Sequence, residues 1–245
     1  MGLTAPAQVP RVLRSLKTWL VWKLIQKPDE KKPRKVPFYV SGAPRDGAQG
    51  SPEDRALLTT YDKAAAACAG GRWTGLGLAV LPDSGIVALD FDNCVSSSGV
   101  MDPRIAALIA GTYSEISPSK TGVRAFYTGS LRSRKDNAGK LERHPNGTRL
   151  DGKFDVEFFG TTGFVTFTGN VTDDCDLFGL HDTVTPLTPE VLALYAERFK
   201  DDGAISLSSD TADLLNLASP SLGWTLVQGR QFLFDCDPGA HATSG

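Results

Sequence analysis

The chain has 245 residues, of which 41% are hydrophobic and 22% charged, a composition typical of a globular protein with one domain or two small ones. The formal net charge of −2 excludes a protein that is basic throughout. No apolar stretch approaches the ~20 residues that span a bilayer, and the N-terminal residues do not follow the pattern of a secretory leader. The sequence therefore predicts a cytoplasmic protein without a membrane partner.

The cysteines agree with this prediction. The chain contains four of them, widely separated and without a C-x-x-C pair, which argues against both a zinc knuckle and a disulfide framework. The three histidines are equally scattered, so a histidine-rich metal site is not expected.

The first half of the chain predicts alternating strands and helices. Ser51 and Pro52 suit the N-cap and the first position of a helix. An alanine-rich run that begins at Tyr61 predicts a second helix, ended by Gly70 and Gly71. A P-D-S-G turn joins two apolar runs, which indicates a hairpin. We expect strands at residues 19–24, 35–40, 75–81 and 86–92, and a helix over 61–69.

The second half continues this alternation. We expect a short helix at residues 103–109, a strand pair at 114–117 and 123–128, a hairpin at 154–159 and 164–168 around G-T-T-G, and an amphipathic helix at 189–199. Because strands arrive mostly in pairs with helices between them, the pattern predicts an α+β fold with mixed, mostly antiparallel sheets. Aromatic residues within apolar strands are expected in the core, namely Trp19, Trp22, Trp73 and Phe158.

Residues 86–92 read I-V-A-L-D-F-D and are the most informative run in the chain. In a strand, residues i and i+2 point to the same face, so Asp90 and Asp92 should project together while Phe91 turns into the core. Two neighbouring carboxylates repel each other unless a cation neutralises them. Hard oxygen ligands suit Mg²⁺ or Mn²⁺, so the run predicts half of a divalent metal site.

Glu157 is a third metal candidate, in the run D-V-E-F-F-G. Val156 and Phe158 would occupy the opposite face of its strand. If this strand lies beside residues 86–92, three carboxylates converge, and such a cluster can hold two divalent ions for an in-line phosphoryl displacement. A solvent-facing position for Glu157 is the alternative.

A polar and basic turn lies between these acidic runs, S-P-S-K-T-G-V-R at residues 117–124. Ser119, Thr121 and Gly122 permit a tight turn with outward N–H groups, which suits phosphate. Lys120 adds positive charge, and Arg124 could hold phosphate bidentately. An ordinary polar hairpin turn is the alternative, because the run is not a G-x-x-x-x-G-K-[ST] loop.

Positive charge is concentrated in two other places. Residues 31–35 include four Lys or Arg, and residues 132–153 include seven. Such patches are compatible with binding a phosphate backbone, although solvated loops would also account for them.

In their order along the chain, these pieces resemble the primase–polymerase domain of phage and plasmid replication proteins, in the archaeo-eukaryotic primase superfamily. The resemblance covers roughly residues 19–170. Six motifs carry it: W-L-V-W-K, K-V-P-F, G-L-G-L-A-V, V-A-L-D-F-D-N-C, S-P-S-K-T-G-V-R-A-F-Y and V-E-F-F-G-T-T-G-F-V-T-F-T-G. No single motif is highly specific, but the shared order and spacing are more so.

The resemblance implies a catalytic domain at residues 1–185 with a core related to RNA-recognition-motif-like sheets. Residues 186–245 would form a C-terminal helix and tail, a linker to a further domain. The implied activity is that of a template-dependent DNA primase or polymerase, a nucleotidyltransferase that acts in replication of a phage, plasmid or other mobile element. Its partners would be a single-stranded DNA template, dNTP or NTP, and a replicative helicase.

The resemblance also implies roles for individual residues. Asp90, Asp92 and Glu157 would be catalytic and would hold Mg²⁺ or Mn²⁺, which bind the triphosphate and activate the 3′-hydroxyl. The nucleotide-binding residues would be Ser119, Lys120, Thr121 and Arg124 near the triphosphate, with Lys35 and Arg149 in contact with nucleotide or template.

The chain departs from this family at Arg124, because the second motif commonly ends in His. Arginine can neutralise phosphate but does not deprotonate at working pH, which removes an acid–base role. One alternative is therefore a nucleic-acid-binding replication protein that keeps the fold and has lost synthesis. Another is a haloacid-dehalogenase-type phosphatase, because D-F-D-N-C loosely matches the D-x-D-x-T/V motif of that family, with Cys94 at the Thr/Val position.

Overall fold

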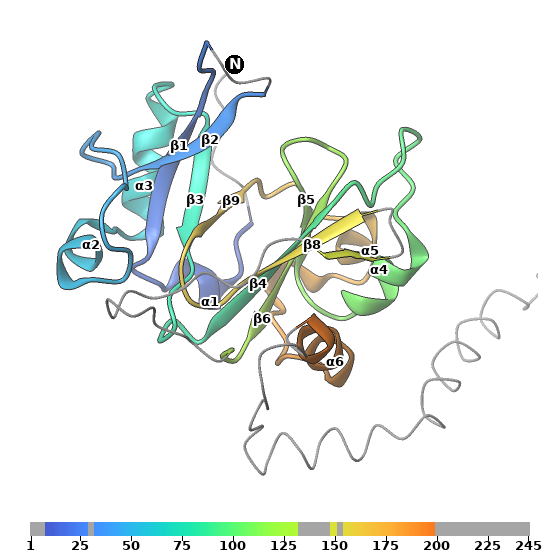
Figure 1. Cartoon of the computed structure of the whole chain (residues 1–245). Helices are drawn as coiled ribbons and strands as arrows, with labels where there is room; N and C mark the ends of the chain where they lie inside the picture. The colour runs from blue at the N-terminus through green and yellow to red at the C-terminus, as the bar shows by residue number, and fades with distance from the viewer. Residues whose placement is uncertain (1–7, 29–31, 132–147, 151–153, 199–245) are drawn as a thin grey trace, which may run out of the picture. The chain divides into compact units, whose positions relative to one another are not determined.

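The computed structural model of the chain describes residues 8–28, 32–131, 148–150 and 154–198 (Figure 1). The chain divides into two units, Met1–Leu187 and Thr188–Gly245. In the described part of the second unit, helix α6 (Pro189–Arg198) forms where the amphipathic pattern predicts it. The first unit contains both sheets and the candidate site.

Two antiparallel sheets form the body of the first unit. The first contains β1 (Trp19–Ile25), β2 (Arg34–Phe38), β3 (Gly75–Ala79) and β9 (Phe164–Phe167), in the order β2-β1-β3-β9. The second contains β4 (Ile86–Asp92), β5 (Ser114–Ile116), β6 (Val123–Thr128), β7 (Thr148–Leu150) and β8 (Phe154–Phe159), in the order β5-β6-β4-β8-β7. Each ladder between these strands is antiparallel, and helices lie between several of them, so the predicted α+β class is confirmed.

Two of the predicted hairpins are wrong, whereas the pairing of β5 with β6 is confirmed. β3 and β4 follow each other through the P-D-S-G turn but belong to different sheets, and so do β8 and β9. A turn signal predicts a reversal of the chain, but not which strand edge the next segment joins. Ala79 of β3 pairs with Phe164 of β9, and Ala88 of β4 pairs with Phe159 of β8. The two segments that pass from one sheet to the other, from β3 to β4 and from β8 to β9, are therefore adjacent. They bring the first sheet close to β4 and β8.

Short helices connect the strands. They are α1 (Arg11–Arg14), α2 (Pro52–Leu57), α3 (Tyr61–Ala69), α4 (Pro103–Leu108), α5 (Asp173–Leu177) and a 3₁₀ turn at Leu180–Asp182. The Ser51 hydroxyl caps α2 as predicted, accepting a hydrogen bond of 3.3 Å from the N–H of Asp54. The sequence pattern does not predict β7, α1 or α5, because so few residues cannot establish a period. None of the described helices is long and apolar enough to cross a bilayer.

A hydrophobic core joins the two sheets and α3, which covers one face of the first sheet (Figure 1). Trp19 of β1 packs edge-on against Tyr61 of α3 and Phe167 of β9, with ring centroids 5.1 and 5.2 Å apart. Phe167 in turn lies 5.8 Å from Phe126 of β6, so aromatic contacts continue from one sheet into the other. The predicted core positions of Trp19, Trp22, Trp73 and Phe158 are confirmed, because all four side chains are buried.

Candidate functional site

The acidic residues of β4 and β8 lie on one face of the second sheet. In the ladder between these strands, Asp90 pairs with Glu157 and Asp92 pairs with Asp155. Directly paired residues share a face of the sheet, so the four carboxylates form a two-by-two group. Phe91, between the two aspartates, faces the other way and is fully buried. The register thus brings the three predicted metal candidates together and adds a fourth carboxylate.

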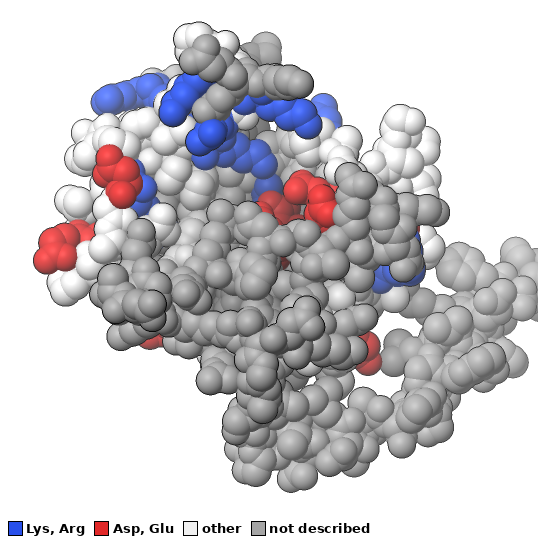
Figure 2. Space-filling view, in the orientation of Figure 1, with Lys and Arg blue, Asp and Glu red and all other residues white. Residues whose placement is uncertain are grey.

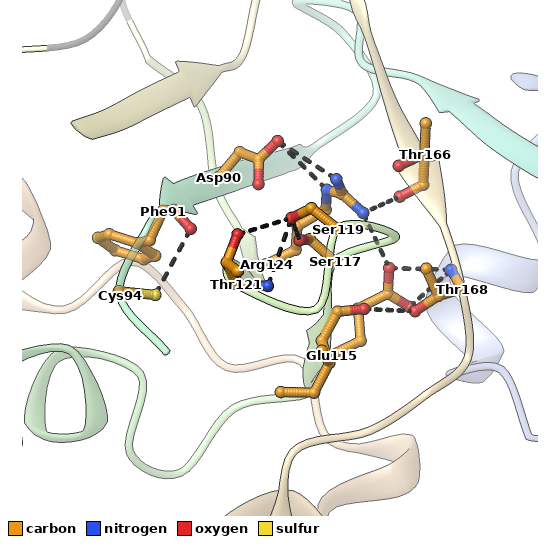
Figure 3. Close-up of polar contacts among 11 residues, drawn as sticks. Asp90, Phe91, Cys94, Glu115, Ser117, Ser119, Thr121, Arg124, Thr166 and Thr168 are labelled. Carbon is orange, nitrogen blue, oxygen red and sulfur yellow. Dashed lines mark hydrogen bonds and ion pairs between the residues drawn. The ribbon is translucent and has the colours of Figure 1, made fainter. Parts of the chain in front are cut away.

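Beside this group, Asp90 on β4, Arg124 on β6 and Glu115 on β5 form a row of charged residues across the second sheet. Arg124 pairs with Asp90 in the ladder between β4 and β6, and with Glu115 in the ladder between β5 and β6. Its side chain is 1% exposed, with Nε and Nη2 at 3.3 and 3.4 Å from Oδ2 of Asp90 (Figure 3). Nη1 lies 3.7 Å from Oε1 of Glu115 and donates a hydrogen bond of 2.9 Å to the carbonyl oxygen of Thr166. The charge of Arg124 is therefore shared between two carboxylates of the chain itself.

Glu115 is the innermost carboxylate of the row and is fully buried. Its oxygens accept hydrogen bonds of 3.0 and 3.1 Å from the N–H of Thr168 and of 2.9 Å from the N–H of Gly169. Burial raises the pKa of Glu115 to about 7, and Arg124 and these backbone groups act in the opposite direction. The backbone that follows β9 therefore holds Glu115, and Glu115 contacts Arg124 on the side away from Asp90.

The acidic residues suit a divalent cation in their chemistry. Mg²⁺ and Mn²⁺ prefer carboxylate oxygens, and Oδ1 of Asp90 is buried without a hydrogen-bond partner in the described part of the chain. A buried polar atom of this kind is costly unless a ligand satisfies it. Among the described residues, no three His, Cys, Asp or Glu side chains are yet arranged to hold a metal ion. A bound ion would therefore require rotation of these side chains, whose backbone positions place them on one face of the sheet.

Asp92 stands at the exposed rim of the group. Partial loss of hydration and then the negative charge of Asp90 raise the pKa of Asp92 above its usual value. The charged form of Asp92 is thus disfavoured in the folded protein, and a nearby cation would reverse this effect.

A cleft of about 360 Å³ opens beside the carboxylates, between the two sheets. Its second-sheet wall includes Asp90, Arg124 and Glu157. The opposite wall comes from β2, the loop before α2 and the segment that ends in β9, and consists of Lys35, Pro37, Arg45, Gln49, Gly163, Phe164, Val165 and Thr166. A volume of this size can accept a small organic ligand.

Lys35 lies close to the acidic residues at this cleft. Loss of hydration and then the positive charge of Arg124 lower the pKa of Lys35, while Asp90, Asp92 and Glu157 oppose the shift. Figure 2 shows the same neighbourhood, with Lys and Arg side chains over the β1–β2 end of the unit and a group of acidic side chains beside them. The cleft therefore combines anionic and cationic groups.

Arg45 closes the cleft at the loop before α2. Its Nε and Nη2 donate hydrogen bonds of 2.7 and 2.8 Å to the carboxylate of Asp54, and both side chains are buried. Asp54 also accepts a hydrogen bond of 2.8 Å from the hydroxyl of Tyr39, and Arg45 donates one of 2.8 Å to the carbonyl oxygen of Gly163. These bonds fix Arg45 and compensate its charge, so this part of the cleft wall is rigid.

Most of the turn predicted to hold phosphate packs against the end of β4, and of its residues the cleft lining includes Arg124 alone. The hydroxyl oxygens of Ser117, Ser119 and Thr121 are linked by hydrogen bonds of 2.8 and 3.1 Å (Figure 3). Lys120 has a φ of +64°, a left-handed conformation that is costly outside glycine. Ser119, Lys120 and Thr121 are exposed at the rim of the sheet and are not among the residues that line the cleft.

Arg149 lies on β7, where its backbone pairs with Asp155, and most of the basic segment at residues 132–153 lies outside the described residues. Sequence reasoning misses Asp155 and Glu115. The D-V-E run of β8 repeats the acidic–apolar–acidic alternation of D-F-D in β4, and this signal identifies Asp155. Glu115 carries no such signal, because it is a single acidic residue in a short strand.

No protein-family model and no curated protein sequence matches this chain.

Proposed function

We propose that this chain is a template-dependent DNA primase or polymerase that carries out two-metal nucleotidyl transfer in replication of a phage, plasmid or other mobile element. The main support is the group of four carboxylates, Asp90, Asp92, Asp155 and Glu157, beside a cleft that also contains Lys35. Like charges on adjacent strands are unfavourable by themselves, so their grouping favours a bound cation. The motif order supports the remaining parts of the proposal, a nucleotide substrate and an RNA-recognition-motif-like primase core.

In this proposal Asp90, Asp92 and Glu157 hold Mg²⁺ or Mn²⁺, and Asp155 adds charge beside Asp92. The bound ions would neutralise the triphosphate and favour loss of the proton from the attacking 3′-hydroxyl. Lys35 would bind phosphate oxygens from the opposite wall of the cleft, because its ammonium group is a compact cation.

The other predicted contacts surround this cleft. The turn with Ser119, Lys120 and Thr121 would bind phosphate at the rim, and Arg149 would contact nucleotide or template. The proposed partners are a single-stranded DNA template, dNTP or NTP, and a replicative helicase.

Arg124 has a different role from the histidine that commonly ends this motif in the resembled family. Its guanidinium stays charged at working pH and contacts Oδ2 of Asp90, whereas Oδ1 has no partner in the described part of the chain. We therefore assign Arg124 to holding Asp90 with Oδ1 available for the cation, and assign no proton transfer to it.

The test is primer synthesis and extension on single-stranded DNA, with dNTP or NTP and with Mg²⁺ or Mn²⁺. The wild-type chain should form product, and Asp90→Asn or Asp92→Asn should lower the rate by about two orders of magnitude or more, as loss of charge stabilisation does elsewhere. Asp173→Asn, at an exposed position of α5, is the matched control and should keep the wild-type rate. Absence of product under all of these conditions would contradict the proposal.

A replication protein that binds nucleic acid without synthesis is the second candidate. It is favoured by the ion pair between Arg124 and Asp90 and by the lack of three converging ligands among the described side chains. In that case the assay gives no product, but the protein still binds single-stranded DNA. The phosphatase has less support, because the ladders between the described strands are all antiparallel and that family has a parallel sheet. Phosphate release from small phosphomonoesters would favour it.

A further inference from the structure

The side chains of Arg124 and Glu115 lie behind Asp90, and backbone groups of β9 and of the residues after it hold both. The carbonyl oxygen of Thr166 accepts from Arg124, while the N–H groups of Thr168 and Gly169 donate to Glu115. All three backbone groups belong to β9 or to the residues directly after it. The charged row of the second sheet is thus anchored by the backbone of the first (Figure 3).

Within this row, three backbone hydrogen bonds hold Glu115, whereas one of 2.9 Å holds Arg124. The backbone bonds to Glu115 are 2.9 to 3.1 Å long, whereas the guanidinium of Arg124 lies 3.3 Å from Asp90 and 3.7 Å from Glu115. Arg124 therefore sits between a fixed carboxylate and one that faces the cleft. Because the row is buried, a change of charge at Glu115 is poorly screened from Asp90.

We propose that Glu115 is a positioning residue for the carboxylate site: it acts through Arg124, holding the guanidinium so that Asp90 keeps its negative charge available to a cation. With Glu115 ionised, the charges of Glu115 and Arg124 cancel, and the net charge of the row is that of Asp90. Without the charge of Glu115, Arg124 neutralises Asp90 instead, and a cation is bound less tightly. This inference rests on the metal site of the proposed function.

Binding of Mn²⁺ to the full chain tests the proposal without any measurement of synthesis. Free Mn²⁺ is measured by its electron paramagnetic resonance signal in titrations of the wild type, Glu115→Gln, Arg124→Gln and the double variant. We expect Glu115→Gln to weaken Mn²⁺ binding by about threefold to tenfold, the size of effect that loss of a nearby buried charge produces. Glu53→Gln, at an exposed position of α2, is the control and should leave binding unchanged.

The double variant separates positioning from a merely structural role. By the same count of charges, the double variant has the row charge of the wild type, so adding Arg124→Gln to Glu115→Gln should return the Mn²⁺ affinity toward the wild-type value. If Glu115 has only a structural role, Glu115→Gln would lower the unfolding temperature but would leave the Mn²⁺ affinity of the folded protein unchanged. If Glu115→Gln alone does not fold, the comparison of the double variant with the wild type still decides, because replacing both partners leaves no unpaired buried charge. An affinity of the double variant far below that of the wild type would then overturn the proposal.

The outcomes distinguish this inference from the metal site itself. Wild-type affinity in folded Glu115→Gln, or a double variant that binds Mn²⁺ no more tightly than Glu115→Gln, would overturn the role of Glu115 alone, provided that Asp90→Asn abolishes binding. A wild-type chain that binds no Mn²⁺ would overturn both the metal site and the positioning role.

Discussion

Asp90 on β4 and Glu157 on β8 are direct partners in an antiparallel ladder, so two carboxylates far apart in the sequence face the same side at adjacent positions. Such a pair is destabilising unless opposite charge compensates it. Arg124 supplies part of the compensation from β6, and Lys35 adds positive charge at the cleft. The register between β4 and β8 thus brings these carboxylates together, although they belong to different sequence motifs.

Neutralising the fourth carboxylate should weaken metal binding. Asp155 pairs with Asp92, and residues that support metal ligands typically contribute tenfold or more to metal affinity. We expect Asp155→Asn to raise the dissociation constant for Mn²⁺ by about tenfold, measured by paramagnetic resonance. The isosteric change Asp173→Asn on α5 should have no effect. Equal affinity of Asp155→Asn and the wild type would remove Asp155 from the site.

Neutralising Asp92 should stabilise the metal-free protein slightly. Partial loss of hydration and the charge of Asp90 raise the pKa of Asp92, so its charged form opposes folding at neutral pH. Because Asp92 is exposed and therefore screened, Asp92→Asn should raise the free energy of unfolding by only about 0.5 kcal/mol. Urea denaturation at pH 7 measures this gain, which should shrink at high salt. A loss of stability would show that the repulsion is not significant.

Glu115 should make the free energy of unfolding depend on pH near neutrality. Its pKa is raised from 4.5 to about 7 in the folded chain, so between these values the folded state binds more protons than the unfolded state. This contribution to stability is fully present below the unfolded pKa and is lost as pH rises through the folded pKa, a change on the order of 3 kcal/mol. It should be absent in Glu115→Gln. Urea denaturation from pH 4.5 to 8 would show it, and parallel curves for the two proteins would contradict it.

Gly122 should be intolerant of a side chain. A Cβ there would lie 2.6 Å from the carbonyl oxygen of Phe91, which belongs to the strand that carries Asp90 and Asp92. We expect Gly122→Ala to lower the free energy of unfolding by about 1–3 kcal/mol, the usual range for overpacking. Gly47→Ala is the control, because a Cβ at Gly47 meets no atom within 4 Å. Similar melting temperatures for the two variants would argue against close packing of this turn on β4.

The local structure was accessible from the sequence because its causes act over a few residues. Ser51 caps α2 through a neighbouring N–H, Gly70 and Gly71 end α3, and alternation in I-V-A-L-D-F-D places both aspartates on one face. Asp155 could have been found by applying the same alternation to D-V-E. The short elements β7, α1 and α5 could not have been predicted from the sequence, because so few residues show no measurable period.

By itself, then, the sequence determined the order of the longer elements, the α+β class and the shared face of Asp90 and Asp92. Only the tertiary structure decided that β4 lies between β6 and β8, that the expected hairpins at P-D-S-G and G-T-T-G pass between two sheets, and that Arg124 joins Asp90 to Glu115. The reason is physical. Alternation and capping depend on neighbouring residues, whereas sheet partners depend on which strand edges are free and which apolar faces can be buried together, and those conditions involve the whole chain.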